Sequence, residues 1–138
     1  MNIKKGRGYV YSLEYHIVWC VKYRQEILFG NLKEDLIEIL KNIVKNNDFE
    51  IIEINVNKDY IHMIVSLSPQ HYIPNVMKAL KGVSARLIFK KYKDDLKDKL
   101  WSKNLWNPSY FISIVSDDSY NEIVNYIESQ RLKKWLRL

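Results

Sequence analysis

The chain has 138 residues, of which 47% are hydrophobic and 28% are charged, and this size and composition predict one domain, residues 1–138, with a single core. A formal net charge of +6 points to a polyanionic partner such as nucleic acid, because lysine and arginine neutralise phosphates. The lone cysteine, Cys20, excludes an intramolecular disulfide. No apolar run approaches the ~20 residues that span a bilayer, and the amino terminus lacks the apolar part of a signal peptide. We therefore expect a cytoplasmic protein without membrane attachment.

Two strand-forming segments flank a predicted helix in the first half of the chain. Residues 1–8 are basic and contain glycine, and we interpret them as a frayed terminus or a mobile arm that touches phosphate. Residues 9–22 alternate in side-chain type and become apolar on both faces, which predicts a long central strand. Residues 32–47 repeat apolar side chains at helical spacing and predict a helix that covers a sheet. Residues 49–57 and the strand that begins at Tyr60 predict an antiparallel hairpin.

A second helix, a last strand and a final helix follow. The second helix begins near Pro74. Its predicted inner face consists of Val76, Met77, Leu80, Val83 and Leu87. Residues 110–115 predict the last strand. The order strand, helix, strand, strand, helix, strand, helix is that of the split βαβ pattern. We therefore predict an α+β, ferredoxin-like antiparallel sheet with helices on one face and an added carboxy-terminal helix.

Histidine and tyrosine side chains raise the question of a metal site. Alternation places Tyr60 and His62 on the less apolar face of their strand. A packed, hydrogen-bonded imidazole is one interpretation of His62, and a metal ligand is the other. His16, on the first predicted strand, is interpreted as a buried structural residue. In the last helix, Tyr126 and Gln130 are four positions apart and share a face. A nucleophile could therefore stand beside an amide oxygen that binds a metal.

Basic and aromatic residues along the second helix, with two more in the turn after the first strand, indicate a nucleic-acid surface. The candidate DNA-binding residues are Lys22, Arg24, Lys78, Lys81, Arg86, Lys90 and Trp106. Tyr92 and Trp101 lie close to them in the sequence. Such a surface can hold phosphates while aromatic rings stack on unpaired bases. A solvated charged helix face is the alternative interpretation of the same residues.

Six short motifs extend over nearly the whole chain. They are residues 15–24 (YHIVWCVKYR), 58–63 (KDYIHM), 69–74 (PQHYIP), 79–87 (ALKGVSARL), 105–111 (LWNPSYF) and 126–130 (YIESQ). Together, in this order, they resemble the TnpA-type single-tyrosine transposases of small insertion sequences, which are members of the HUH nuclease superfamily. A match in several independent blocks is more specific than a match to one triplet.

The resemblance implies a homodimeric enzyme that acts on single-stranded DNA with hairpin ends. In such proteins a tyrosine attacks a phosphodiester, forms a 5′-phosphotyrosine intermediate and leaves a free 3′-hydroxyl for rejoining. On this chain the resemblance implies that Tyr126 is the catalytic nucleophile and that His62 and Gln130 bind Mg²⁺ or Mn²⁺. Tyr60 stands where the family has the first histidine of its metal site, and a neutral phenol is a poor ligand for Mg²⁺.

Three explanations of Tyr60 follow: a variant that binds metal through His62, Gln130, water and DNA phosphate, a partly disabled copy, or an adapted DNA-binding relative. The alternative function is accordingly a non-catalytic protein that binds hairpin or single-stranded DNA. A ferredoxin-like module that binds a small anion or another protein is a third hypothesis. A metal-dependent covalent adduct that disappears in Tyr126→Phe distinguishes the catalytic hypothesis from the other two.

Overall fold

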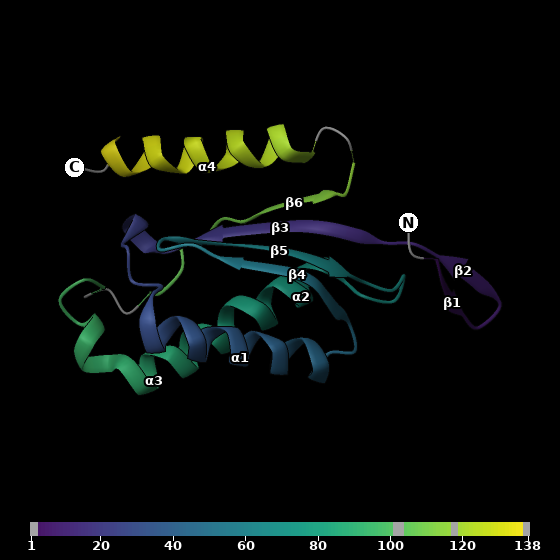
Figure 1. The fold of residues 1–138 in the computed structure, drawn as a ribbon, viewed down its shortest axis with the longest axis horizontal. Helices are drawn as coiled ribbons and strands as arrows, with labels where there is room; N and C mark the ends of the chain where they lie inside the picture. Colours follow the sequence, from purple (N-terminus) through teal and green to yellow (C-terminus); the bar gives the residue numbers. More distant parts are fainter. Residues whose placement is uncertain (1–2, 101–103, 117–118, 137–138) are drawn as a thin grey trace.

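Four antiparallel strands form the main sheet of the computed structural model, which describes residues 3–100, 104–116 and 119–136. The strands are β3 (Glu14–Cys20), β4 (Glu50–Val56), β5 (Tyr60–Ser66) and β6 (Phe111–Ile114). Their spatial order is β4-β5-β3-β6, so β3 and β5 are central (Figure 1). This order is that of the split βαβ topology, and it confirms the predicted ferredoxin-like α+β fold.

Helices cover both faces of the sheet. The helices α1 (Gly30–Asn46), α2 (Ile73–Lys78) and α3 (Ser84–Leu96) lie on one face, below the sheet in Figure 1. The added carboxy-terminal helix α4 (Ser119–Leu136) lies on the opposite face. Among the helices that the structure describes, none combines the length and the apolar character needed to cross a bilayer.

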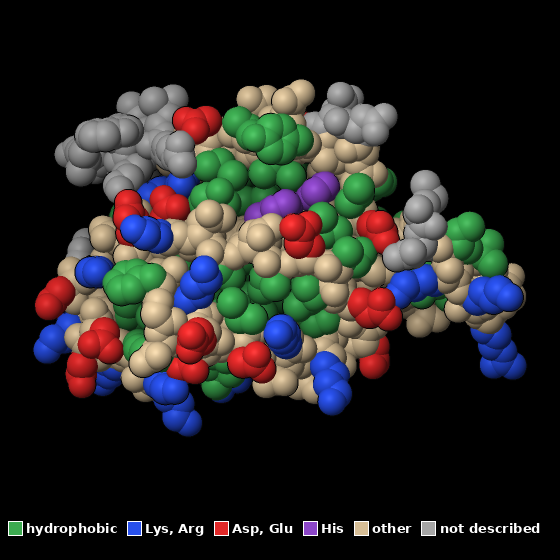
Figure 2. Space-filling model, in the orientation of Figure 1, with side chains coloured by type: hydrophobic (Ala, Val, Ile, Leu, Met, Phe, Trp, Pro, Cys, Tyr) green, Lys and Arg blue, Asp and Glu red, His purple; other side chains and the backbone are tan. Residues whose placement is uncertain are grey.

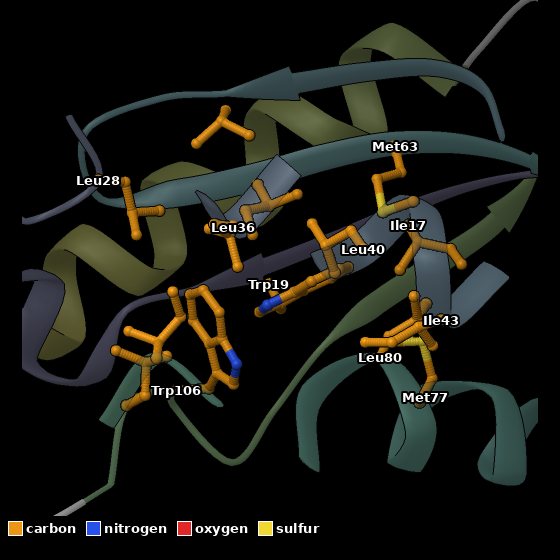
Figure 3. Close-up of a cluster of buried hydrophobic side chains, with 14 of the residues drawn as sticks. Ile17, Trp19, Leu28, Leu36, Leu40, Ile43, Met63, Met77, Leu80 and Trp106 are labelled. Carbon is orange, nitrogen blue, oxygen red and sulfur yellow. The ribbon is translucent and has the colours of Figure 1, made fainter. Parts of the chain in front are cut away.

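Side chains of β3 alternate between the two faces of the sheet, and each face has its own apolar cluster. The larger cluster, on the side of α1 to α3, includes the fully buried Ile17, Trp19, Leu36, Leu40 and Leu80 (Figure 3). On the other face, Val18 packs with Ile123 and Ile127 of α4. The main core therefore lies beneath three helices, while α4 covers a small cluster.

The amino-terminal segment differs from its prediction. The long strand predicted over residues 9–22 is divided into β2 (Tyr9–Tyr11) and β3. β2 pairs with β1 (Lys4–Gly6) in a separate two-stranded ribbon, so the prediction of a frayed arm is wrong for these residues. Gly8 lies between the two strands with a φ of +83°, a conformation that glycine adopts without strain. An ion pair from Lys4 to Glu50 connects the ribbon to β4.

A wide turn changes the register of the second predicted helix. Residues Ala79–Val83 form a π-helical turn between α2 and α3, and such a turn contains one more residue than an α-helical turn. The inner face therefore shifts by one position in α3. Ser84 and Ile88 are completely buried, whereas the predicted positions Val83 and Leu87 are only partly buried.

Candidate active site

Tyr126 lies on α4 beside the small apolar cluster of the sheet. Its ring centroid is 5.5 Å from that of Phe111 on β6, and its hydroxyl is hydrogen-bonded to the Ser109 hydroxyl at 2.9 Å. Burial raises the pKa of Tyr126, and the hydrogen bond to Ser109 offsets part of that rise. The phenol is therefore neutral near pH 7.

Gln130 follows Tyr126 by one helical turn and is almost completely buried. Its Oε1 accepts a hydrogen bond of 3.2 Å from Nδ2 of Asn107. The Oδ1 of Asn107 accepts a hydrogen bond of 3.2 Å from the backbone N–H of Ser109. The polar turn before β6 therefore contacts both predicted active-site residues of α4. From the sequence, this segment is recognisable only as one of the shared motifs, and no site role is predicted for Asn107 or Ser109.

Lys81, in the π-helical turn, holds this polar turn in place. Its ammonium donates hydrogen bonds to the carbonyl oxygens of Asn107 at 2.7 Å, Pro108 at 3.1 Å and Ser109 at 3.1 Å. Burial lowers the pKa of Lys81 to about 8. A side chain engaged with three carbonyl groups supports the loop, and DNA binding by Lys81 stays a prediction.

Trp106 is part of the core and cannot stack on a base in this structure. Only 6% of its surface is exposed. Its indole N–H donates a hydrogen bond of 3.0 Å to the Ser84 hydroxyl, and its ring meets Trp19 edge to face with 5.8 Å between centroids (Figure 3). Stacking requires an exposed ring face, so this arrangement gives no support to the predicted DNA contact of Trp106, which stays a prediction. Trp101 lies outside the described residues.

Arg24 is a buried connection between the sheet and α4, with 2% of its surface exposed. Its Nε donates a hydrogen bond of 3.0 Å to Asp59, and its Nη1 donates one of 3.1 Å to the carbonyl oxygen of Ile127. Tyr23 and Arg24 have left-handed backbone conformations, with φ values of 60° and 53°, which are uncommon for residues other than glycine. The guanidinium of Arg24 thus connects Asp59 to α4, and DNA binding by Arg24 stays a prediction.

His62 and His16 face each other on the two central strands. β3 and β5 pair with Val18 opposite His62, so both histidines lie on the face that α4 covers. The Nδ1 of His16 is 2.8 Å from the Nε2 of His62. Burial lowers the pKa of both imidazoles, so both are neutral near pH 7. His16 is only partly buried, which corrects its interpretation as a buried structural residue. Figure 2 shows histidine side chains reaching the surface just below the top layer of the molecule.

The three predicted metal ligands have different surroundings. His62 and Gln130 are hydrogen-bonded to different residues, and the Arg24 guanidinium lies 5.7 Å from the ring centroid of Tyr60. Neutral imidazole and amide oxygen suit a divalent cation, whereas a neutral phenol is a poor ligand for Mg²⁺. Within the described ranges, no three His, Cys, Asp or Glu side chains gather as a metal-binding group.

Three predicted DNA contacts are exposed on the outer side of α2 and α3. Lys78 and Arg86 line one groove, and Arg86 and Lys90 line a second groove with further lysines of α3. The structure therefore brings these three cations together along one continuous surface. Lys22 lies in the turn after β3, where its ammonium is 5.3 Å from the ring centroid of Tyr23. DNA binding by these four residues stays a prediction.

Comparisons with known sequences point to one family. The family model described as "Transposase IS200 like" matches residues 9–130. The ISDra2 transposase TnpA of Deinococcus radiodurans is 50% identical over 134 residues, which cover 97% of this chain and 95% of the relative. The transposase for insertion sequence element IS200 of Salmonella typhimurium is 28% identical over 120 residues, which cover 87% of this chain and 78% of the relative.

Solved structures agree with this assignment. The crystal structure of a putative transposase from Deinococcus radiodurans has a TM-score of 0.86 and 46% identity, covering 92% of this chain and 97% of that chain. A REP-associated tyrosine transposase bound to a REP hairpin has a TM-score of 0.57 and 17% identity, covering 96% of this chain and 74% of that chain, and this likeness supports the fold alone. The chain therefore belongs to the IS200-like family of transposases.

Proposed function

We propose that this protein cleaves and rejoins single-stranded DNA at the ends of its insertion sequence. The observation that carries the proposal is the position of Tyr126. α4 holds its hydroxyl at the polar turn that also contacts Gln130, on the sheet face that carries His62. Tyrosine-mediated phosphodiester cleavage needs a nucleophile together with groups that hold a cation near the phosphate.

In the proposed reaction, the Tyr126 oxygen attacks phosphorus and the bond to the 3′ oxygen breaks. The phenol loses its proton, the 3′ oxygen gains one, and the 5′ phosphate remains esterified to the tyrosine. Attack by a 3′-hydroxyl on this ester reverses the step and rejoins a strand, because the ester conserves the bond. Burial raises the pKa of Tyr126, so the proton must be removed as the attack proceeds.

His62 and Gln130 are the residues that would hold Mg²⁺ or Mn²⁺ in this site. A bound divalent cation polarises the phosphate and offsets negative charge on the leaving oxygen. Tyr60 is outside the proposed ligand set, because a neutral phenol is a poor ligand for Mg²⁺. Water and DNA phosphate would supply the remaining oxygen ligands.

A covalent adduct tests the proposal. The protein is incubated with single-stranded DNA that carries the element end and its flank, in the presence of Mn²⁺, and is then run on a denaturing gel. We expect a shifted band that EDTA prevents and that Tyr126→Phe lacks. Tyr120→Phe is the matched control, because Tyr120 is a tyrosine of the same helix with 75% of its surface exposed. A band that persists in Tyr126→Phe would refute the assigned nucleophile.

A non-catalytic hairpin-binding protein is the second candidate function. Tyr60 favours it, because a tyrosine at this position removes one imidazole from the ligand set that the resemblance implies. Hairpin binding without an adduct, in Mg²⁺ and in Mn²⁺, would support this alternative. Tyr60→His would then show whether restoring the imidazole restores cleavage.

Hairpin DNA is the proposed partner of the exposed cations on α2 and α3. The proposal is supported by the two grooves that share Arg86. We expect Arg86→Ala and Lys90→Ala each to weaken binding to all sequences and to reduce the slope of log K against log[salt] by about 1. Lys45→Ala is the control, because Lys45 is exposed on α1 and lines neither groove.

A homodimer with shared active sites is the proposed working form, as the resemblance to TnpA-type transposases implies. Mixing His62→Ala with Tyr126→Phe protein tests it. If His62 of one subunit serves Tyr126 of the other, the mixture regains adduct formation that each variant lacks. A mixture that stays inactive argues for sites within one subunit.

A further inference from the structure

Next to His62 lies a histidine that the proposed reaction does not use. We infer that His16 is a positioning residue, whose Nδ1 accepts a hydrogen bond from the Nε2–H of His62 and so leaves Nδ1 of His62 as the lone pair that binds a divalent cation. The inference rests on the proposed function, because it takes His62 as a metal ligand.

The geometry of the two rings is that of a direct hydrogen bond. The nitrogens are 2.8 Å apart, the ring centroids are 5.1 Å apart and the ring planes differ by 18°. The centroid separation exceeds the nitrogen separation by about the two ring radii, so both nitrogens lie close to the line between the rings. Two metal–nitrogen bonds on that line would need about 4.2 Å. The gap therefore accommodates a proton rather than a cation.

The sheet holds both rings in this arrangement. His16 and His62 lie on β3 and β5, the two central strands, in neighbouring positions of one antiparallel register. Strands in the middle of a sheet are constrained by hydrogen bonds on both sides. The backbone of the sheet therefore holds the two imidazoles next to each other. Both side chains are only partly buried, which leaves the outward side of the pair accessible to a ligand.

The direction of the hydrogen bond follows from the ligand role proposed for His62. The Nε2 of His62 is committed to Nδ1 of His16, so Nδ1 of His62 is the nitrogen left for a cation. A metal-binding nitrogen needs its lone pair, and a neutral imidazole carries its one N–H on the other nitrogen. His62 therefore donates from Nε2, and Nδ1 of His16 accepts.

Tyr60 makes this positioning important. With a tyrosine at that site, His62 is the sole imidazole in the proposed ligand set. Hydrogen-bonded partners of metal-binding histidines fix the ring orientation and the tautomer, and their loss typically lowers metal affinity about 10- to 100-fold. His16 therefore supports the one nitrogen ligand on which the site depends.

Nitrogen-15 NMR of the histidine rings tests the tautomer without metal or DNA. We expect His62 to be protonated at Nε2 in the wild type and to become a mixture of tautomers in His16→Ala. A wild-type His62 protonated at Nδ1 would overturn the inference. His71→Ala is the control, because the ring of His71 is hydrogen-bonded to Ser68 and Asn47 instead.

Mn²⁺ binding tests the ligand role by calorimetry and pulsed EPR. We expect coupling to one imidazole nitrogen in the wild type and an affinity lower by about tenfold or more in His16→Ala. His16→Asn should stay within about threefold of the wild type, because its amide can accept the same hydrogen bond, and it replaces the alanine variant if that fails to fold. Two coupled imidazole nitrogens, no coupling to His62, or unchanged affinity in His16→Ala would contradict the inference.

These outcomes are separable from the test of the proposed function. An adduct that depends on Tyr126, combined with metal binding that ignores His16, would leave the function standing and remove the role of His16. If Mn²⁺ binding and the His62 tautomer depend on His16 but no adduct forms, the role of His16 stands and the proposed function is refuted.

Discussion

Helices α1, α2 and α3 bury a large apolar cluster against one face of the sheet, whereas α4 covers the other face with a small cluster and several polar contacts. On the first face, Trp19 and Leu36 are completely buried. On the second, His16, His62 and Tyr126 keep part of their surface exposed. The face under α1, α2 and α3 therefore provides most of the apolar core, and the face under α4 carries the candidate active site.

This division predicts different consequences of mutation on the two faces. Burying a leucine side chain contributes about 1.5–3 kcal/mol through the hydrophobic effect, and the helix-covered face has many such residues. The α4 face depends more on hydrogen bonds from a charged group, each contributing about 1.5–3 kcal/mol. Elements with few buried apolar contacts open locally before the whole protein unfolds, so α4 should detach more easily than α1.

Leu36→Ala should have the largest effect on stability. The residue is fully buried on the large-core face, and a leucine-to-alanine change there should lower the free energy of unfolding by about 3 kcal/mol. Urea unfolding followed by circular dichroism measures this loss, with Leu87→Ala as the partly buried control. A loss below that of the Arg24 variant described next would contradict the proposed difference between the faces.

Arg24→Gln should loosen α4 while the core stays folded. The change removes the ion pair with Asp59 and the hydrogen bond to the Ile127 carbonyl, at a cost of about 2 kcal/mol. Hydrogen exchange should show faster exchange in α4 and little change in α1. Lys22→Gln, two residues before Arg24 in the same turn, is the matched control and should alter neither helix. Uniformly faster exchange in both helices would mean that Arg24 supports the whole fold.

Ile127→Val should have a smaller effect, confined to the α4 face. Ile127 belongs to the small cluster with Val18, and removing one methylene group from a buried isoleucine costs about 1 kcal/mol. The free energy of α4 opening, measured by hydrogen exchange, should fall by this amount. Val124→Ala, on an exposed position of the same helix, provides the reference. Equal effects of the two changes would show that the cluster does not hold α4.

Of these four substitutions, Ser109→Ala should have the smallest effect on stability and the largest effect on the pKa of Tyr126. The Ser109 hydroxyl lowers the pKa of Tyr126 against the rise caused by burial, so its removal should raise that pKa further and slow adduct formation. Because the folded state then holds the Tyr126 proton to a higher pH than the unfolded state, stability should fall as pH rises above about 10. Ultraviolet titration against the Ser109→Ala/Tyr126→Phe double variant isolates Tyr126. An unchanged titration would exclude Ser109 as its effective partner.

Local patterns were sufficient to predict most of the fold. Alternation in β3 and β5 and the helical spacing over residues 32–47 depend on side-chain periods that packing preserves. The π-helical turn has no such signature, so the pattern misplaced Val83 and Leu87 on the inner face. The break between β2 and β3 at residues 12–13 was not predicted for a related reason. Side chains keep alternating through these residues, although β2 pairs with β1 and β3 pairs with β5.

The candidate site was harder to predict, because polar side chains depend on distant partners. Arg24, Lys81 and Trp106 resemble solvent-facing DNA contacts in the sequence, yet each is committed to residues far along the chain. His16 and Val18 are two residues apart and so share one face of a strand, but only the strand register brings His16 to His62. The shared motif at residues 105–111, which contains Asn107 and Ser109, was the available signal for the support of Tyr126.

The left-handed turn at Tyr23 and Arg24 has a consequence for the engineering of this protein. A glycine at position 24 would relax the backbone by about 1–2 kcal/mol. Here the same glycine would delete the guanidinium that reaches Ile127. Selection for heat resistance and selection for activity should therefore retain the same arginine, in contrast to the usual trade-off between stability and activity at functional sites.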